Sequence, residues 1–390
     1  MLEAFFFLFI FIIFYVYFGY PLIILIIAAI KKRTVQASDN FEPTVSLIIS
    51  AFNEEKVIEE KLKNSFSLNY PKEKLEIIVF SDASTDNTED IVKQYQKDGV
   101  ILIQLSARKG KTAGQNIAVT QAKGEIVVFS DANALYRKDA IRKMVRNFYD
   151  QSVGCVCGEL VYYSEDKSLI GDAENVYWDY EKFIKRQENR AASILGANGS
   201  IYAVRKNLFV PLPEDIISDF IEPFKIIEQR YCVIYEPEAL SFEQSTTNFH
   251  EEYHRKKRII NRSFYSLLHY KTFLNPIKYP LLSFQLFSHK LLRWLIPVYL
   301  PIIFVINLFL LNSLFFQITF GFQILFYATA ILGYLLEKKH WHNIVFYAPF
   351  YYCLVNIASL QAIVNFFIKR KKVVTWKPIR LKKSLDAKSN

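Results

Sequence analysis

Two oxygen-bearing side chains, Asp131 and Asn133, stand one residue apart directly after the apolar run Ile126–Phe129. Carboxylate and amide oxygens are ligands that Mg²⁺ and Mn²⁺ accept, with water or a diphosphate completing an octahedron. An Asp/Asn pair after a strand is also a common turn, because these side chains hydrogen-bond to nearby backbone groups. The pair is therefore a candidate site for Mg²⁺ or Mn²⁺, and its surroundings decide between a metal site and a turn.

Two further polar clusters follow apolar runs earlier in the chain. The first is Ala51–Glu54, which includes Asn53, and the second centres on Asp82 in the sequence SDASTDNT. The Asp82 carboxylate, with Ser84 and Asp86, offers hydrogen-bond acceptors to the edge of a base or to a ribose hydroxyl. These two clusters are candidates for holding a nucleoside.

A basic, glycine-containing segment, Lys109-Gly110-Lys111, lies between the second and third clusters. Its cations and permissive backbone suit phosphate groups. The GKT at 110–112 is not a P-loop, because that motif requires glycine at the position of Leu105. We expect Lys111 to help bind the phosphates of a donor without forming a P-loop.

Alternating strands and helices position these clusters. Because strand and helix patterns alternate, the sequence predicts an α/β fold with a doubly wound, mostly parallel sheet and helices on both faces. In such sheets ligands bind beyond the carboxyl ends of the strands, which is where all three polar clusters fall. The predicted strands cover 44–50, 76–80, 100–105 and 126–129, and the predicted helices cover 54–66, 89–97 and 112–121.

Long apolar segments flank this domain. Residues 4–30 carry no charge and, at about 1.5 Å per residue in a helix, can cross a bilayer. A signal peptide fits poorly, because no basic segment precedes the stretch and Lys31-Lys32-Arg33 follows it. Charged residues interrupt 283–294, which suits a helix lying in the interface. Three later segments are long enough to span: Leu295–Phe316, Ile318–Leu336 and Ile344–Ile368.

The net charge of +10 does not require a nucleic-acid partner, because many basic residues flank the apolar segments. Anionic headgroups on the cytoplasmic side are the simpler partner, and Lys31–Arg33 predicts that residues 31–280 are cytoplasmic. Three spans after a cytoplasmic domain would place the basic tail outside, against the same rule. One apolar segment is therefore expected to be interfacial or re-entrant, or the number of spans differs from this count.

The order of the motifs resembles the family-2 glycosyltransferases, most closely the membrane-embedded cellulose, hyaluronan and poly-N-acetylglucosamine synthases. The resemblance covers roughly residues 42–265 and rests on VSLIISAFNEE, SDASTDNT, RKGKTAGQNIAVTQAKGEIVVFSDAN and GANGSIYAVRKNLF. It implies a GT-A fold, a nucleotide-sugar donor, most often UDP-linked, and inversion at the anomeric carbon.

The resemblance also implies roles for single residues. Ala51, Asn53, Glu54 and Asp82 match donor-binding positions, Asp131 matches the first Asp of a DxD motif, and Asn133 stands at the second. Gly199 and Ser200 fall at acceptor-binding positions. Asp219, in EDIISDFIEPF, matches the catalytic base, which takes the proton of the acceptor hydroxyl opposite the leaving diphosphate. Glu222 and Asp215 are the alternatives for that role.

The chain departs from the processive synthases in the stretch 251–263. Arg258 stands at the Arg of their Gln-x-x-Arg-Trp motif, and Ile259 stands where Trp would be. Arg255, Arg258 and Arg262 recur at helical spacing and could bind a diphosphate together or serve as membrane-surface charges. Loss of the Trp removes a stacking platform for an acceptor sugar.

Two alternatives come from other classes of protein. His250-Glu251-Glu252-Tyr253-His254 satisfies H-E-x-x-H, the zinc-binding pattern of a membrane peptidase, although no third ligand is evident. A noncatalytic membrane scaffold is disfavoured, because the donor-site positions all retain polar chemistry.

The sequence therefore predicts an inverting membrane glycosyltransferase that moves a sugar from a UDP-sugar to a growing β-linked polysaccharide. Transfer of one sugar to a polyprenyl-linked or glycolipid acceptor is the alternative. The expected location is the cell (inner) membrane, with the catalytic domain cytoplasmic. The expected parts are a transmembrane helix at 1–30, a GT-A domain at 31–250, interfacial helices at 251–294, transmembrane helices at 295–368 and a basic cytosolic tail at 369–390.

Overall fold

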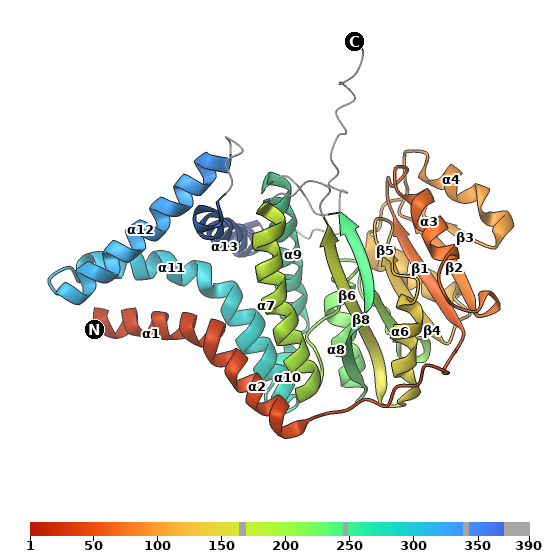
Figure 1. The fold of residues 1–390 in the computed structure, drawn as a ribbon, viewed down its shortest axis with the longest axis horizontal. Coiled ribbons are helices and arrows are strands. Elements are labelled where there is room, and N and C mark those ends of the chain that lie inside the picture. The colour runs from red at the N-terminus through yellow and green to blue at the C-terminus, as the bar shows by residue number, and fades with distance from the viewer. Residues whose placement is uncertain (164–168, 245–248, 338–342, 370–390) are drawn as a thin grey trace, which may run out of the picture.

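A computed structural model describes residues 1–163, 169–244, 249–337 and 343–369. An α/β domain with one large sheet lies at one end of the molecule, and long helices from both ends of the chain gather at the other (Figure 1). The predicted basic tail lies, apart from Lys369, outside the described residues.

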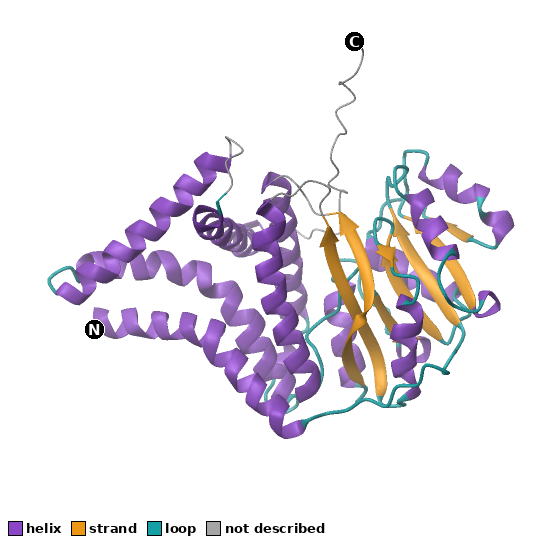
Figure 2. Ribbon diagram, viewed as in Figure 1, coloured by secondary structure: helices purple, strands orange, loops and turns teal. Residues whose placement is uncertain are grey.

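In the part of the chain that the structure describes, the sheet has eight strands in the order β3-β2-β1-β4-β7-β6-β8-β5. Figure 2 shows the strands of the sheet side by side at one end of the molecule. Strands β1, β2, β3 and β4 are mutually parallel, as is the pair β6 and β8, whereas β7 runs antiparallel to both of its neighbours. The strands are β1 Val45–Ala51, β2 Leu75–Ser81, β3 Ile101–Gln104, β4 Ile126–Asp131, β5 Leu135–Tyr136, β6 Val153–Tyr163, β7 Tyr202–Arg205 and β8 Cys232–Gln244.

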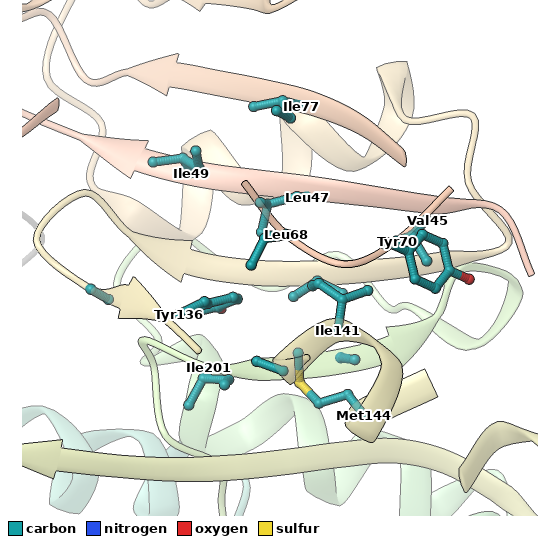
Figure 3. Close-up of a cluster of buried hydrophobic side chains, with 14 of the residues drawn as sticks. Val45, Leu47, Ile49, Leu68, Tyr70, Ile77, Tyr136, Ile141, Met144 and Ile201 are labelled. Atoms are coloured by element: carbon teal, nitrogen blue, oxygen red, sulfur yellow. The ribbon is translucent and has the colours of Figure 1, made fainter. Parts of the chain in front are cut away.

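Helices cover both faces of the sheet. Side chains of α3 and α6 pack into one buried cluster, and Figure 3 shows part of it with Ile141 and Met144 of α6. Side chains of α5 and α8 pack into a second cluster on the opposite face. Strand β1 lies between β2 and β4 and is buried on both faces, which explains its unbroken apolar run. The helices of the domain are α3 Ile58–Phe66, α4 Thr88–Gln94, α5 Lys111–Gln121, α6 Ala140–Val145, α7 Leu169–Ala191, α8 Ser218–Glu228 and α9 Phe249–His269.

The predicted doubly wound, mostly parallel sheet is confirmed, and each predicted strand matches an observed strand within two residues at either end. The helix predicted from residue 54 begins at Ile58, because residues 54–57 form a turn whose carbonyl at Glu54 accepts from the backbone of Val57 and Ile58. The sequence did not predict the second half of the sheet, in which β7 is inserted antiparallel between two strands.

Within the described residues, four helical stretches are long and apolar enough to cross a membrane: Leu2–Lys31, Pro280–Phe309, Leu314–Leu336 and Ile344–Ile368. They comprise α1 Leu2–Phe14, α2 Tyr20–Lys31, α10 Pro280–Gln285, α11 Leu292–Phe309, α12 Leu314–Glu337 and α13 Ile344–Lys369, with short π-helical turns at Tyr15–Gly19 and Leu286–Leu291. Residues 283–294 are continuous with α11, and a turn at 310–313 lies inside the apolar segment expected at Leu295–Phe316. These helices associate the protein with a membrane.

Candidate active site

The polar clusters meet at one edge of the sheet. In the strand register Ala51 lies beside Ser81, and Ser50 lies beside Asp131, so the carboxyl ends of β1, β2 and β4 coincide. The structure therefore brings Ala51–Glu54, Asp82 and Asp131 together, as the parallel arrangement predicted.

The side chain of Asp82 organises the loop that precedes α5. It is fully buried, and its carboxylate accepts hydrogen bonds from the backbone N–H groups of Lys109 (2.7 Å) and Gly110 (3.1 Å). Its own N–H donates to the carbonyl of Ala51 at 2.9 Å. Asp82 thus ties together the loop ends of β1 and β2 and holds the Lys109–Lys111 segment over them.

Asn53 and Glu54 join the loops that follow β1 and β2. Asn53 adopts a left-handed backbone conformation, with φ of 53°, and its side-chain oxygen accepts from the N–H of Thr85 at 2.8 Å. The N–H of Glu54 donates to the hydroxyl of Thr88 at 2.7 Å. Asn tolerates the left-handed region better than most residues, which explains its place in this turn.

Lys111, the first residue of α5, connects the metal-site candidate with the acceptor-site candidates. Its ammonium pairs with Asp131 Oδ1 at 2.5 Å and donates to the carbonyl oxygen of Gly199 at 2.9 Å. Asn133, in the same loop as Asp131, is exposed. The loop therefore presents one carboxylate already paired with a cation, and one neutral amide facing solvent.

The carboxylate of Asp219 lies at the same place, in the first turn of α8. A Cβ atom added to Gly199 would lie 2.3 Å from Asp219 Oδ2 and 3.1 Å from Lys111 Nζ, so the carboxylate rests against the bare Cα of this glycine. Burial raises the pKa of Asp219 above its ordinary value, and the charge of Asp131 raises it further, while Lys111 opposes both. A carboxylate with a raised pKa is a stronger base than an exposed one.

The two alternatives for the base are placed less favourably. Glu222 is fully buried, accepts from the N–H of Val210 at 3.1 Å, and has its pKa raised by that burial to about 8. A carboxyl group with this pKa is mostly protonated at pH 7 and cannot take a proton there. Asp215 accepts a hydrogen bond from the hydroxyl of Tyr265 at 2.7 Å.

Ser200 is held from behind by Tyr136. The phenol of Tyr136 donates to the carbonyl of Ser200 at 2.9 Å and lies 3.1 Å from the carbonyl of Phe129. The Ser200 hydroxyl oxygen is buried, and it lies near the carboxyl group of Glu243, whose pKa it lowers.

The arginines of α9 divide into two groups. Arg262 donates to the carbonyl of Ile216 at 3.2 Å, near Asp219, and its buried Nε has no partner within the described part of the chain. The pKa of Arg258 is lowered by burial and by the neighbouring arginines, whereas Asp131 opposes this shift, so Arg258 also faces the site. Arg255 instead donates to Glu252 at 2.7 Å and to the Tyr162 hydroxyl at 2.8 Å.

Two charged residues near Asp131 were not predicted from the sequence. Lys61, in α3, is fully buried, donates to the carbonyl of Ala134 and lies 3.9 Å from the ring centre of Tyr136. Burial lowers its pKa to about 7, and the nearby Asp131 partly opposes this shift. Glu243, at the end of β8, has its pKa raised to about 7, first by burial and then by Asp131. In the sequence Lys61 looks like one more solvent-facing charge of an amphipathic helix.

Replacing Lys61 by Met is expected to stabilise the fold at neutral pH and to lower activity. The folded pKa lies below the unfolded value, so the unfolded chain binds a proton that the folded chain lacks, and wild-type stability rises with pH. The stability advantage of Lys61→Met should therefore shrink by up to about 1.4 kcal/mol per pH unit between pH 7 and pH 10. Thermal unfolding of both proteins in detergent across this range measures the difference; a pH-independent difference would contradict it.

The H-E-x-x-H segment forms part of α9. His250 Nε2 and His254 Nε2 lie 3.0 Å apart, as expected for residues one helical turn apart. Among the described residues, no group of three or more His, Cys, Asp or Glu side chains could hold a metal ion. The zinc-peptidase alternative therefore gains no third ligand from the described part of the chain.

Comparison with known proteins identifies relatives of the α/β domain. Residues 46–210 match the family described as Glycosyl transferase family 2. The chain is 26% identical to "Probable glycosyltransferase YdaM" of Bacillus subtilis over 68% of this chain and 67% of that protein. It is 28% identical to the poly-beta-1,6-N-acetyl-D-glucosamine synthase of Staphylococcus aureus over 50% of this chain, and the match spans about half (48%) of that synthase.

One solved structure resembles nearly the whole molecule. The mannosyltransferase PcManGT from Pyrobaculum calidifontis, solved with GDP-Man and Mn²⁺, superposes with a TM-score of 0.71 at 22% identity. The superposition covers 95% of this chain and 100% of that chain. The shared fold is GT-A-like and includes the helices at both ends.

Proposed function

We propose that this chain, whose residues 46–210 match the glycosyltransferase family 2 domain, transfers a sugar from a UDP-sugar, with inversion, to a growing β-linked polysaccharide at a membrane. The observation that carries this proposal is the convergence of Asp219, Lys111 and Asp131 around Gly199. That convergence brings one buried carboxyl group and one ion pair to the carboxyl ends of the parallel strands, which supports the proposal. The structural neighbour was solved with GDP-Man, which supports a nucleotide-sugar as the donor.

In this proposal Asp219 removes the proton of the acceptor hydroxyl as that oxygen attacks the anomeric carbon. One base on the face opposite the leaving diphosphate gives inversion in a single displacement. Lys111 and Arg258 neutralise negative charge that develops on the diphosphate. Asp82, Asn53 and the loop that they hold position the nucleoside, which fixes the sugar's distance from Asp219.

The donor set around Asp131 fits Mg²⁺ or Mn²⁺ only as a site completed by the donor. Asp131 and Asn133 would hold the ion through oxygen atoms, and diphosphate and water oxygens would supply the remaining ligands. Lys111 already shares Asp131, so the protein alone offers little net negative charge to the ion. When bound, the ion supplies positive charge to the leaving diphosphate.

Removing divalent ions is expected to lower the rate of sugar transfer roughly 10²–10⁴-fold, because the ion contributes several kcal/mol of stabilisation to the transition state. Mn²⁺ or Mg²⁺ should restore activity, and Mn²⁺ binding followed by electron paramagnetic resonance should tighten when UDP is present. Undiminished activity after complete chelation would instead mean that Lys111 and the arginines of α9 neutralise the diphosphate without a metal.

A second candidate function is the addition of a single sugar to a polyprenyl-linked or glycolipid acceptor. The observation that favours it is Ile259, which is 41% exposed at the position where the processive synthases carry Trp. An aliphatic side chain there provides no aromatic surface for stacking an acceptor sugar.

Hydrolysis of a panel of nucleotide-sugars by the purified full-length protein tests the donor, and sizing of the product tests processivity. A ladder of increasing length supports polysaccharide synthesis, whereas a single added sugar supports the second candidate. Absence of turnover with every UDP-sugar and GDP-sugar would contradict both. The proposed location is the cell membrane with the catalytic domain in the cytoplasm, since Lys31–Arg33 follow the first apolar helix.

A further inference from the structure

We propose that α13 does not cross the bilayer but lies along its surface, on the side of the glycosyltransferase domain. One face of α13 packs against α9, its first half also packs against α12, and its exposed face lies at the boundary between lipid headgroups and acyl chains. The inference concerns the path of the chain and holds whichever sugar is transferred. It differs from the expectation based on length and hydropathy, by which α13 could span.

The first observation is that α13 follows α9 along most of its length. Both ends and the middle of α13 contact successive turns of α9, so the two helices run side by side in the same direction. The contacts are the rings of Phe249 and Phe350 (4.9 Å between centroids), the Glu252 carboxylate and the Tyr351 hydroxyl (3.4 Å), Lys257 Nζ and Gln361 Oε1 (2.8 Å), and the rings of Phe264 and Phe366 (5.3 Å).

The second observation is that α9 is too highly charged for the hydrocarbon core. A Lys, Arg or Asp at the centre of a membrane helix costs about 2.5–3.5 kcal/mol on insertion scales. If α13 crossed the bilayer, α9, which packs along it, would also lie in the hydrocarbon core. The ionised residues of α9 are Glu251, Glu252, Arg255, Lys256, Lys257, Arg258 and Arg262.

The depth of α9 is fixed independently by the active site. Arg262 donates to the carbonyl of Ile216, three residues before the proposed base Asp219. Since α9 belongs to the wall of a site that takes a water-soluble donor, it lies outside the core. Its neighbour α13 lies at the same depth.

The contacts of Tyr352 indicate that α13 lies at the same depth in the membrane as α9. The ring of Tyr352 lies 6.2 Å from that of Tyr17, and Tyr17 lies 5.7 Å from the guanidinium of Arg293. Arg293 pairs with Glu181 of α7. Tyr352, in the first half of α13, therefore lies beside an ion pair and a second tyrosine, a combination of residues that is typical of a headgroup interface.

The exposed residues of α13 give it a lipid-facing side. Ile357, Val364 and Ile368 are exposed and lie seven and four residues apart, so they occupy one face of the helix. In Figure 1, α1 and α11 run side by side away from the sheet, α12 leans back toward it, and α13 is foreshortened beside α7 and α9.

The charge pattern of the sequence agrees with this path. The turn between α11 and α12, residues 310–313, carries no charge, whereas residues 338–342 contain Lys338 and Lys339, and a basic stretch begins at Lys369. If α12 returns to the side of the domain and α13 remains there, every basic connection lies on that side, as the positive-inside rule requires. This removes the conflict between three C-terminal spans and a basic tail.

Labelling of single cysteines in intact cells tests the path. Cys155 and Cys157 are fully buried and can stay, whereas Cys232 and Cys353 are partly exposed and are replaced by alanine. A membrane-impermeant maleimide should modify Ser313→Cys in intact cells, and Ser389→Cys only after permeabilisation. The cysteine-depleted protein without an introduced cysteine is the control. Modification of both positions in intact cells would show that α13 crosses, and would overturn the proposal.

Depth measurement separates a surface helix from a re-entrant one. Nitroxide labels at Val345, Ile357, Val364 and Phe367, all exposed, are read in liposomes against a soluble and a lipid-soluble relaxation agent. A surface helix gives similar shallow depths at the four positions. A depth that rises to about half of the 30 Å hydrocarbon thickness at Ile357 and falls at both ends would overturn the proposal.

Discussion

Asp219→Asn is expected to lower kcat for sugar transfer by about 10²–10⁴-fold, the usual contribution of a positioned general base. Asn keeps the size of the side chain against Gly199 but cannot accept a proton. Donor affinity should change little, because the carboxylate faces the acceptor side of the site in the proposed mechanism. Rate measurements at saturating donor, with UDP binding measured separately, distinguish a lost base from a lost fold.

Glu222→Gln is the matched control for this variant. Glu222 lies three residues further along α8, and its pKa of about 8 leaves it protonated at neutral pH. Its amide replacement should therefore retain most activity. Full activity in Asp219→Asn, or a larger loss in Glu222→Gln, would remove Asp219 from the role of base.

The pH dependence of wild-type transfer provides a second test of Asp219. Burial and the charge of Asp131 raise the pKa of Asp219. The rate of transfer should therefore be at its maximum above this raised pKa and should fall as the pH falls through it. In a plot of kcat/KM against pH, the midpoint of the acidic limb should therefore lie above the ordinary pKa range of an aspartate. Gly199→Ala, whose Cβ would press on Asp219 Oδ2, should disturb this limb, whereas Glu222→Gln should leave it in place.

The parallel half of the sheet and its polar edge could be predicted from sequence, because both depend on local patterns. A buried parallel strand reads as an unbroken apolar run, and its carboxyl end is marked by the polar residues that follow it. Asp82 and Asp131 were located in this way. Their shared edge then followed from the rule that parallel strands end together.

The remaining features depend on contacts between distant segments. The insertion of β7 between β4 and β6 leaves no periodic signal, and the burial of Lys61 depends on Ala134 and Tyr136, more than seventy positions along the chain. The close approach of Asp219 to Gly199 likewise requires α8 to pack beside the sheet. Hydropathy alone also assigns α13 as a possible span, because a hydropathy profile contains no information about the charged helix α9 that packs beside it.

Asp131→Ala is the other substitution expected to abolish transfer. It removes the partner of Lys111, the only carboxylate of the Asp131-Ala132-Asn133 loop, and a charge that acts on Lys61, Arg258 and Asp219. The loss of ordered charge at the leaving diphosphate should cost roughly 10²–10³-fold or more in kcat. Mn²⁺ binding in the presence of UDP should be lost as well, whereas thermal unfolding should show a folded protein.

Substitutions of Asn133 test whether its amide oxygen is a ligand of the divalent ion. If Asp131 anchors a weak ion that the donor completes, Asn133→Ala should weaken Mn²⁺ binding modestly, and Asn133→Asp should tighten it by adding a second negative ligand. Both changes leave the Lys111–Asp131 ion pair in place, so they test the metal without removing the anchor. If neither change alters Mn²⁺ affinity while Asp131→Ala still abolishes transfer, the role of Asp131 is to hold Lys111 against the diphosphate. The neutral amide would then mark a site in which cations of the protein replace the ion.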